Sequence, residues 1–182
     1  MTGRLLGAIL AGGRARRFGS DKALARLGEA TLMQRALDSL RPYCAVLVVV
    51  GRDKAPVPTA PDLPRAGLGP LGGIAGALAC ARDGGFDAVL TTACDTPFLP
   101  EDLVAALLCE GSGHAAEAPT VGLWPVRLLD PLLDHLARGD DRSIRRWAVS
   151  AGLPALLPGV TVPNINTPDD LSGFHEDPPR SC

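Results

Sequence analysis

The residues best suited to chemistry lie in one stretch near the N-terminus, residues 10–22, which reads LAGGRARRFGSDK. Its glycines let the backbone approach a ligand closely because no Cβ is in the way. Its positive charges are Arg14, Arg16, Arg17 and Lys22. Backbone amides in such a loop, together with Arg and Lys side chains, bind anions. The stretch therefore predicts a polyphosphate-binding loop. An exposed surface turn is the alternative for any single arginine, and Arg17 is favoured as the functional one because it is nearest to Lys22.

A carboxylate is the second candidate. Asp95 follows the apolar segment 87–93 and precedes Thr96 and Pro97, so it is expected at the end of a buried strand. Mg²⁺ needs only one or two protein carboxylates when substrate phosphates supply other ligands. Asp95 is therefore a candidate Mg²⁺ ligand, and Lys22 a candidate to neutralise the transferring phosphate. The alternative for Asp95 is a cap on the next helix. When Asp95 is considered together with residues 10–22, the interpretation as a metal ligand is favoured over the helix cap.

Two further patterns are weaker. Residues 67–72, GLGPLG, match G-x-G-x-x-G but follow a proline-rich segment in place of a strand, which favours a tight turn into a helix that can still line a ligand. In residues 10–22 the glycine and the lysine are not adjacent, as a Walker A loop requires. The histidines, His114, His135 and His175, share no ligand spacing and are predicted to lie on the surface.

The elements that must position these groups alternate between strand and helix. Hydrophobic periodicity, caps and breakers predict strands at 5–10, 45–50, 87–93, 120–126 and 160–162, and helices at 32–40, 72–82, 100–109, 131–137, after Ser143 and at 169–174, with 110–118 a loop or short edge strand. This alternation indicates an α/β fold, a mainly parallel sheet with helices on both faces. Ligands bind at the carboxyl ends of such strands. The N-terminal loop, Asp95, Asn164 and Asn166 are therefore expected at one edge.

Composition narrows the class of protein. The 182 residues suffice for one domain, predicted over 1–176 with a flexible tail at 177–182. A net charge of −2 and 4% aromatic residues argue against nucleic-acid binding. The five cysteines are odd in number and contain no C-x-x-C pair, which favours reduced thiols in a cytoplasmic protein. No apolar run reaches the roughly 20 residues of a membrane-spanning helix, so no membrane contact is expected.

The motifs together resemble one family. They are Leu10-Ala11-Gly12-Gly13 with Arg17, Gly19, Asp21 and Lys22; Gly69-Pro70-Leu71-Gly72-Gly73; Cys94-Asp95-Thr96-Pro97; and Asn164-Ile165-Asn166-Thr167-Pro168-Asp169-Asp170-Leu171. In this order, and across nearly the whole chain, they resemble the molybdenum cofactor guanylyltransferases. The resemblance implies a single three-layer, Rossmann-like nucleotidyltransferase domain. It also implies Mg²⁺-dependent transfer of GMP from GTP to the terminal phosphate of molybdopterin, with release of pyrophosphate.

The resemblance also implies roles for particular residues. The expected nucleotide contacts are Leu10, Ala11, Gly12, Gly13, Lys22, Asp62 and Gly69. Lys22, Arg17 and Asp95 are the expected catalytic residues, and Asp95 also the metal ligand. Asn164 and Asn166 are expected on the pterin side or at the metal. GTP and molybdopterin are the implied substrates, and molybdoenzymes or cofactor chaperones are possible transient partners.

The chain departs from the family pattern in two places. Gly51 stands where the family often has Asn, and the segment 98–118 is several residues shorter than usual. Gly12 stands where cytidylyl-transferring relatives carry Ala, which favours GTP over CTP because it leaves room for a purine. Two alternatives stay open: a cytidylyl- or sugar-phosphate nucleotidyltransferase of the same fold, and a non-catalytic nucleotide- or cofactor-binding accessory protein. Retention of Lys22 and Asp95 argues against the second.

Overall fold

A seven-stranded sheet forms the centre of the molecule in the computed structural model, which describes residues 3–12, 21–139, 141–167 and 170–171. The strand order is β5-β4-β1-β6-β8-β7-β9. The parallel half consists of β1 (Leu5–Leu10), β4 (Val46–Val50), β5 (Thr59–Ala60) and β6 (Ala88–Ala93). The remaining strands are β8 (Gly122–Pro125), antiparallel to β6; β7 (Gly113–Ala115), antiparallel to β8; and β9 (Ala155–Leu156), parallel to β7.

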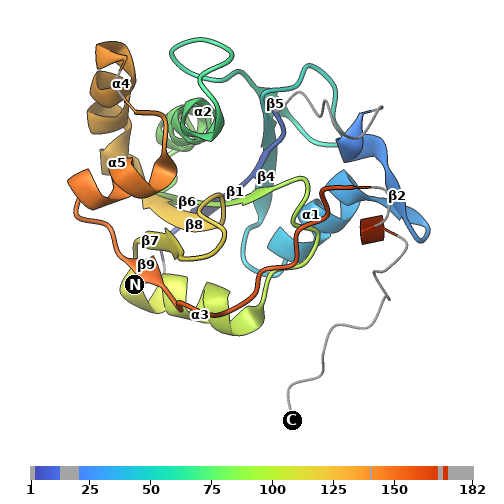
Figure 1. Cartoon of the computed structure of the whole chain (residues 1–182). Coiled ribbons are helices and arrows are strands. Elements are labelled where there is room, and N and C mark those ends of the chain that lie inside the picture. The colour runs from blue at the N-terminus through green and yellow to red at the C-terminus, as the bar shows by residue number, and fades with distance from the viewer. Residues whose placement is uncertain (1–2, 13–20, 140, 168–169, 172–182) are drawn as a thin grey trace.

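Helices cover both faces of the sheet (Figure 1). One face carries α2 (Pro70–Asp83), α4 (Leu129–Arg138) and α5 (Ile144–Ser150), and the other carries α1 (Leu32–Leu40) and α3 (Glu101–Glu110). Two 3₁₀ turns, η1 (Lys22–Leu24) and η2 (Val126–Leu128), and a small hairpin of β2 (Arg26–Leu27) and β3 (Ala30–Thr31) complete the described elements. The predicted α/β class, with a mainly parallel sheet between helices, is confirmed.

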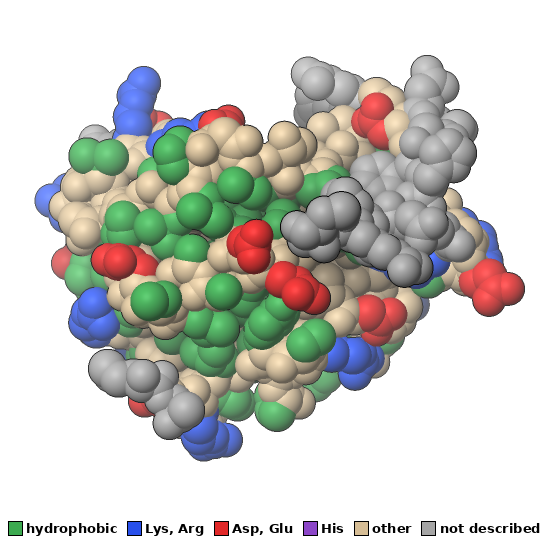
Figure 2. Space-filling model, turned by 90° about the horizontal axis from the view of Figure 1, so that it is seen from below, with side chains coloured by type: hydrophobic (Ala, Val, Ile, Leu, Met, Phe, Trp, Pro, Cys, Tyr) green, Lys and Arg blue, Asp and Glu red, His purple; other side chains and the backbone are tan. Residues whose placement is uncertain are grey.

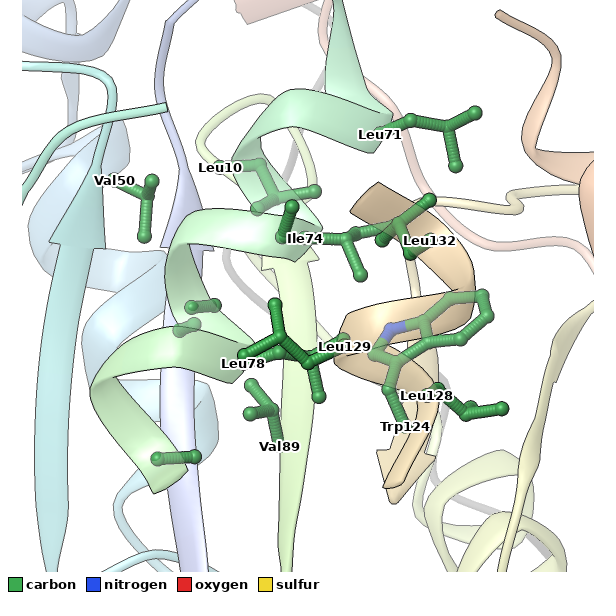
Figure 3. Packing of buried hydrophobic residues seen from close by; sticks show 14 of the residues in the cluster. Leu10, Val50, Leu71, Ile74, Leu78, Val89, Trp124, Leu128, Leu129 and Leu132 are labelled. Carbon is green, nitrogen blue, oxygen red and sulfur yellow. The ribbon is translucent and has the colours of Figure 1, made fainter. Parts of the chain in front are cut away.

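The helix α2 packs unusually close to the sheet because it is built from small residues. Figure 3 shows Ile74 and Leu78 of this helix among the side chains of the sheet and of α4. A Cβ added at Gly76 would lie 2.2 Å from the carbonyl oxygen of Pro61, and one at Gly73 would lie 3.1 Å from the Leu10 side chain. The start of α2 is therefore held beside the carboxyl end of β1.

The opposite face is organised by caps and an apolar stripe. Thr31 caps α1, since its hydroxyl accepts a hydrogen bond from the Gln34 amide, and Leu32, Met33 and Leu37 on that helix are fully buried. Figure 2 views the molecule from below and shows hydrophobic side chains gathered over this face, interrupted by a few acidic ones, with Lys and Arg mainly at its edges. That face has no concentration of positive charge among the residues drawn in colour.

Two predictions about local structure are wrong, and a third concerns residues that lie largely outside the described part of the chain. Residues 160–162 form no strand; the late strand is β9, and Leu157 and Gly159, which follow it, both adopt positive φ and interrupt the extended backbone. His114 is not a surface histidine but is 2% exposed, because β7 lies inside the sheet and its ring stacks on Trp124. The predicted helix 169–174 falls largely outside the described residues.

Candidate active site

The two side chains expected to act together are in direct contact. The Nζ atom of Lys22 lies 3.0 Å from Oδ2 of Asp95, although the two residues are 73 positions apart in sequence. Lys22 follows the loop after β1, and Asp95 follows β6, the strand that pairs with β1. The pair is partly shielded from water, with 11% of the Lys22 side chain and 25% of the Asp95 side chain exposed. The carboxyl ends of neighbouring parallel strands thus bring an ammonium and a carboxylate together.

Local structure explains why Lys22 points at Asp95. Lys22 opens the η1 turn, and Asp21 caps this turn because its Oδ1 accepts a hydrogen bond from the Ala23 amide at 3.2 Å. Both carboxylate oxygens of Asp21 also accept hydrogen bonds from the guanidinium of Arg52, which comes just after β4. This pairing lowers the pKa of Asp21 and raises that of Arg52. Asp21 belongs to the motif that carries the family resemblance, but the sequence analysis assigns it no role, and nothing in the sequence pattern indicates Arg52.

The C-terminal motif reaches the same point. Oδ1 of Asn166 accepts a second hydrogen bond from Lys22 Nζ at 3.0 Å, and the amide of Ile165 donates to the backbone carbonyl of Asp95 at 2.9 Å. The amides of Asn166 and Thr167 both donate to Oδ2 of Asp170, which lowers the pKa of Asp170. The turn that carries Asn166 is therefore anchored on the Lys22–Asp95 pair.

Asn164 stands apart from this group. Its side chain is exposed, and among the hydrogen bonds of the described residues none joins Asn164 to Lys22 or Asp95. The expectation that both asparagines serve the site has a structural contact for Asn166 alone. Asn164 stays a prediction.

Asp62 lies in a cradle of glycines. Cβ atoms added at Gly12 and Gly51 would come within 3.1 Å and 3.0 Å of its carboxylate oxygens, and one at Gly73 within 3.7 Å. Partial burial raises the pKa of Asp62, opposed by a hydrogen bond from the Gly67 amide. Gly12 therefore makes room for Asp62 itself, and the link between Gly12 and purine choice stays a prediction.

The departure at Gly51 has a steric cause in this chain. Gly51 has a φ of +85°, and a Cβ there would lie 2.6 Å from Gly12 Cα and 2.8 Å from Gly12 N. Real Cβ atoms essentially never approach so closely, so β4 and β1 could not end this near each other with Asn at position 51. The glycine thus permits a close approach of the two strand ends beside Asp62.

The charged groups of this edge act electrostatically on one buried thiol, that of Cys94. Burial raises the pKa of Cys94 to about 11, and the charges of Asp95, Lys22, Arg52 and Asp21 all act on it. The same four residues are those joined by the hydrogen bonds described above. A buried thiol with a raised pKa is a poor nucleophile near neutral pH, so no nucleophilic role is assigned to Cys94.

The remaining expected site residues are placed as follows. Leu10 and Ala11 are buried, and the fold uses part of their backbone: the Ala11 amide donates to the carbonyl of Val50, and the Leu10 carbonyl accepts from the Cys94 amide at 3.4 Å. Their roles as nucleotide contacts stay predictions. Gly69 precedes α2 with a φ of +71° and open space around it, which confirms the predicted tight turn into a helix. Gly13 and Arg17 lie outside the described residues.

The Asp95 carboxylate fits a metal ion whose other ligands are phosphate oxygens of a substrate. Within the described part of the chain, no group of three or more His, Cys, Asp or Glu residues could hold a metal ion. Asp95 is a hard oxygen donor at the strand end, and a single carboxylate supplemented by phosphate oxygens suits Mg²⁺. In the same described residues, no helix is both long and apolar enough to span a membrane.

Known proteins of similar sequence identify the class to which this α/β sheet, with Lys22 and Asp95 in contact at its strand ends, belongs. The model of the MobA-like NTP transferase domain matches residues 7–158. The chain is 40% identical over 183 residues to a molybdenum cofactor guanylyltransferase of Rhodobacter capsulatus, covering 93% of this chain and 94% of that protein. It is 36% identical over 188 residues to one of Cereibacter sphaeroides, with the same coverages.

Solved structures agree on the fold. Molybdopterin-guanine dinucleotide biosynthesis protein A from Archaeoglobus fulgidus matches with a TM-score of 0.66 at 24% identity, over 92% of this chain and 95% of that one. The 2-C-methyl-D-erythritol 4-phosphate cytidylyltransferase from Thermus thermophilus matches with a TM-score of 0.67 at 19% identity, over 92% of this chain and 94% of that one.

The chain is a nucleotidyltransferase. It belongs to the MobA-like NTP transferase family and, within it, to the molybdenum cofactor guanylyltransferases.

Proposed function

We propose that the chain transfers GMP from GTP to the terminal phosphate of molybdopterin, forming the guanine dinucleotide cofactor and pyrophosphate in a Mg²⁺-dependent reaction. The observation that carries the proposal is the 3.0 Å contact between Lys22 and Asp95 at the carboxyl ends of β1 and β6. The named relatives at 36–40% identity support guanylyl transfer to the molybdenum cofactor as the reaction.

The proposed reaction is a displacement at the α-phosphorus of GTP, in which Lys22 and Arg17 neutralise negative charge. A phosphate oxygen of molybdopterin attacks the α-phosphorus of GTP, the bond to the β-phosphate oxygen breaks, and pyrophosphate leaves. The attacking phosphate is already ionised near neutral pH, so no general base is needed. Lys22, at the start of η1, is proposed to neutralise charge on the transferring phosphate. Arg17 is proposed to contribute a second positive charge that neutralises the same phosphate.

Asp95 is the residue proposed to hold Mg²⁺ together with the triphosphate oxygens. Bound there, the ion would neutralise charge on the phosphates and orient them. Lys22 Nζ contacts the Asp95 carboxylate, and its ammonium is proposed to turn from the carboxylate toward phosphate when nucleotide binds. Asn166, which also accepts from Lys22 Nζ, is proposed to guide that movement.

The test is release of pyrophosphate from GTP in the presence of Mg²⁺ and molybdopterin. The wild-type chain is expected to release pyrophosphate only when molybdopterin is present, and Asp95→Ala to reduce turnover by on the order of 10²-fold or more. The matched control is Arg41→Met, which removes an exposed ion pair with Asp38 on α1, away from the site. Tight GTP binding without release would instead identify the accessory protein, and near-wild-type turnover of Asp95→Ala would remove Asp95 from the mechanism.

A further inference from the structure

We propose that Arg52 is a positioning residue for nucleotidyl transfer, acting through Asp21 to hold Lys22 at the active site. The proposal deepens the proposed function and rests on it for its kinetic consequence. Its structural claim concerns the ligand-free protein alone: without the Arg52–Asp21 pair, Lys22 is less firmly held at Asp95.

The first support is the geometry of the pair. Two guanidinium nitrogens of Arg52 donate to the two carboxylate oxygens of Asp21, one of them at 2.7 Å. Bidentate pairing of this kind fixes orientation as well as proximity, which a lysine ammonium does not. The side chain of Arg52 is only 18% exposed, so the guanidinium does not sweep freely through solvent.

The second support is the position of Arg52 and Asp95 on the two sides of β1. Arg52 follows β4, Asp95 follows β6, and β1 lies between these strands. Asp21 and Lys22 are consecutive residues, but their partners lie on opposite sides of β1. Asp21 pairs with Arg52 on the β4 side, and Lys22 pairs with Asp95 on the β6 side. The two ion pairs hold the backbone between Asp21 and Lys22 from both sides, so a sideways shift strains one of them.

The third support is that one carboxylate has two partners. Oδ1 of Asp21 accepts both from Arg52 and from the Ala23 amide, the hydrogen bond that begins the η1 turn. The orientation of the Asp21 carboxylate is therefore shared between the ion pair and the turn that presents Lys22. An ordinary exposed ion pair contributes little to stability, so the expected role of Arg52 is positional.

The chain offers an unusually clean substrate-free test, because Lys22 and Lys54 are its two lysines. Lys54 is exposed and serves as the internal reference. An amine-reactive reagent is applied to the ligand-free protein, and labelling of each lysine is followed by mass spectrometry. Arg52→Met is expected to raise labelling of Lys22 relative to Lys54 by about two- to fivefold. An unchanged ratio would overturn the proposal, whatever reaction the protein catalyses.

Asp21→Asn separates the two functions of the carboxylate. Its amide oxygen can still accept from Ala23, but it no longer offers two anionic oxygens to Arg52. The proposal expects Asp21→Asn to raise Lys22 labelling as Arg52→Met does, and the double variant to label no faster than either single variant. Additive effects in the double variant would show that the two residues do not act as one unit, and would contradict the proposal.

Kinetics in two backgrounds distinguish positioning from other roles. In the otherwise wild-type protein, Arg52→Met is expected to lower kcat for GMP transfer about tenfold, with a smaller change in KM for GTP. In the Lys22→Ala background the same substitution should change kcat less than twofold, because nothing is left to position. An equal loss in both backgrounds would mean that Arg52 binds phosphate itself or supports folding generally, and would overturn the proposal.

Discussion

Replacing Lys22 by Met is expected to change two properties in opposite directions. The ammonium now occupies the carboxylate of Asp95 at 3.0 Å, so it competes with any divalent cation for that oxygen. Two unit charges at this distance attract by about 1.4 kcal/mol even at the dielectric constant of water. This value is a lower limit, because the Lys22–Asp95 pair is partly shielded from water. About 1.4 kcal/mol corresponds to a tenfold change in an equilibrium constant.

Lys22→Met should therefore bind a divalent cation about tenfold more tightly than the wild-type chain when no nucleotide is present. Mn²⁺ is the probe, since it suits carboxylate ligands and its free form is measured by electron paramagnetic resonance. Turnover of the same variant should fall by on the order of 10²-fold or more. The Asp95→Ala variant, lacking the carboxylate, is the negative control for Mn²⁺. Equal or weaker Mn²⁺ affinity in Lys22→Met would refute the competition between Lys22 and a metal for Asp95.

Three further predictions concern the surroundings of the site. Burial raises the pKa of Asp62, so its ionised form destabilises the folded state at neutral pH, and this cost disappears as pH falls through the raised pKa. Asp62→Asn should therefore raise Tm at neutral pH, with the gain shrinking toward acid pH; a gain that grows on acidification would contradict the direction. Gly51→Asn should lower the free energy of unfolding in urea by about 1–3 kcal/mol, since its Cβ would meet Gly12 at 2.6 Å; wild-type stability would show that the strand ends separate freely. Thr91→Val removes the hydroxyl that accepts from buried Trp124 at 2.7 Å, and should cost about 1–3 kcal/mol in the same assay with kcat unchanged; no loss would mean that another group takes the indole hydrogen bond.

The fold was predictable because its main signals are local. The valine-rich run of β4 and the cap at Thr31 could each be read within ten residues, and both appear where expected. The meeting of Lys22 and Asp95 followed from one general rule, that ligands bind at the carboxyl ends of parallel strands. It needed no knowledge of which side chains touch.

The parts that were missed depend on contacts between distant segments. Arg52 is one arginine among many in the sequence, and its partner is 31 residues away, so only the packing of β4 beside β1 shows the pair. The reason for glycine at position 51 is likewise the approach of another strand end, at Gly12. Val160 and Val162 are typical of a strand by composition, but residues 160–162 pair with no strand in the structure, where the late strand is β9.

Joint action of Lys22 and Asp95 on one triphosphate is tested by transfer of label from GTP carrying a radioactive α-phosphate to molybdopterin, with α-labelled CTP in parallel. We expect label on molybdopterin from GTP, much less from CTP, and losses of on the order of 10²-fold for both Lys22→Ala and Asp95→Ala. Transfer from GTP that survives in both variants would contradict the claim that the lysine after β1 and the carboxylate after β6 act on the same triphosphate.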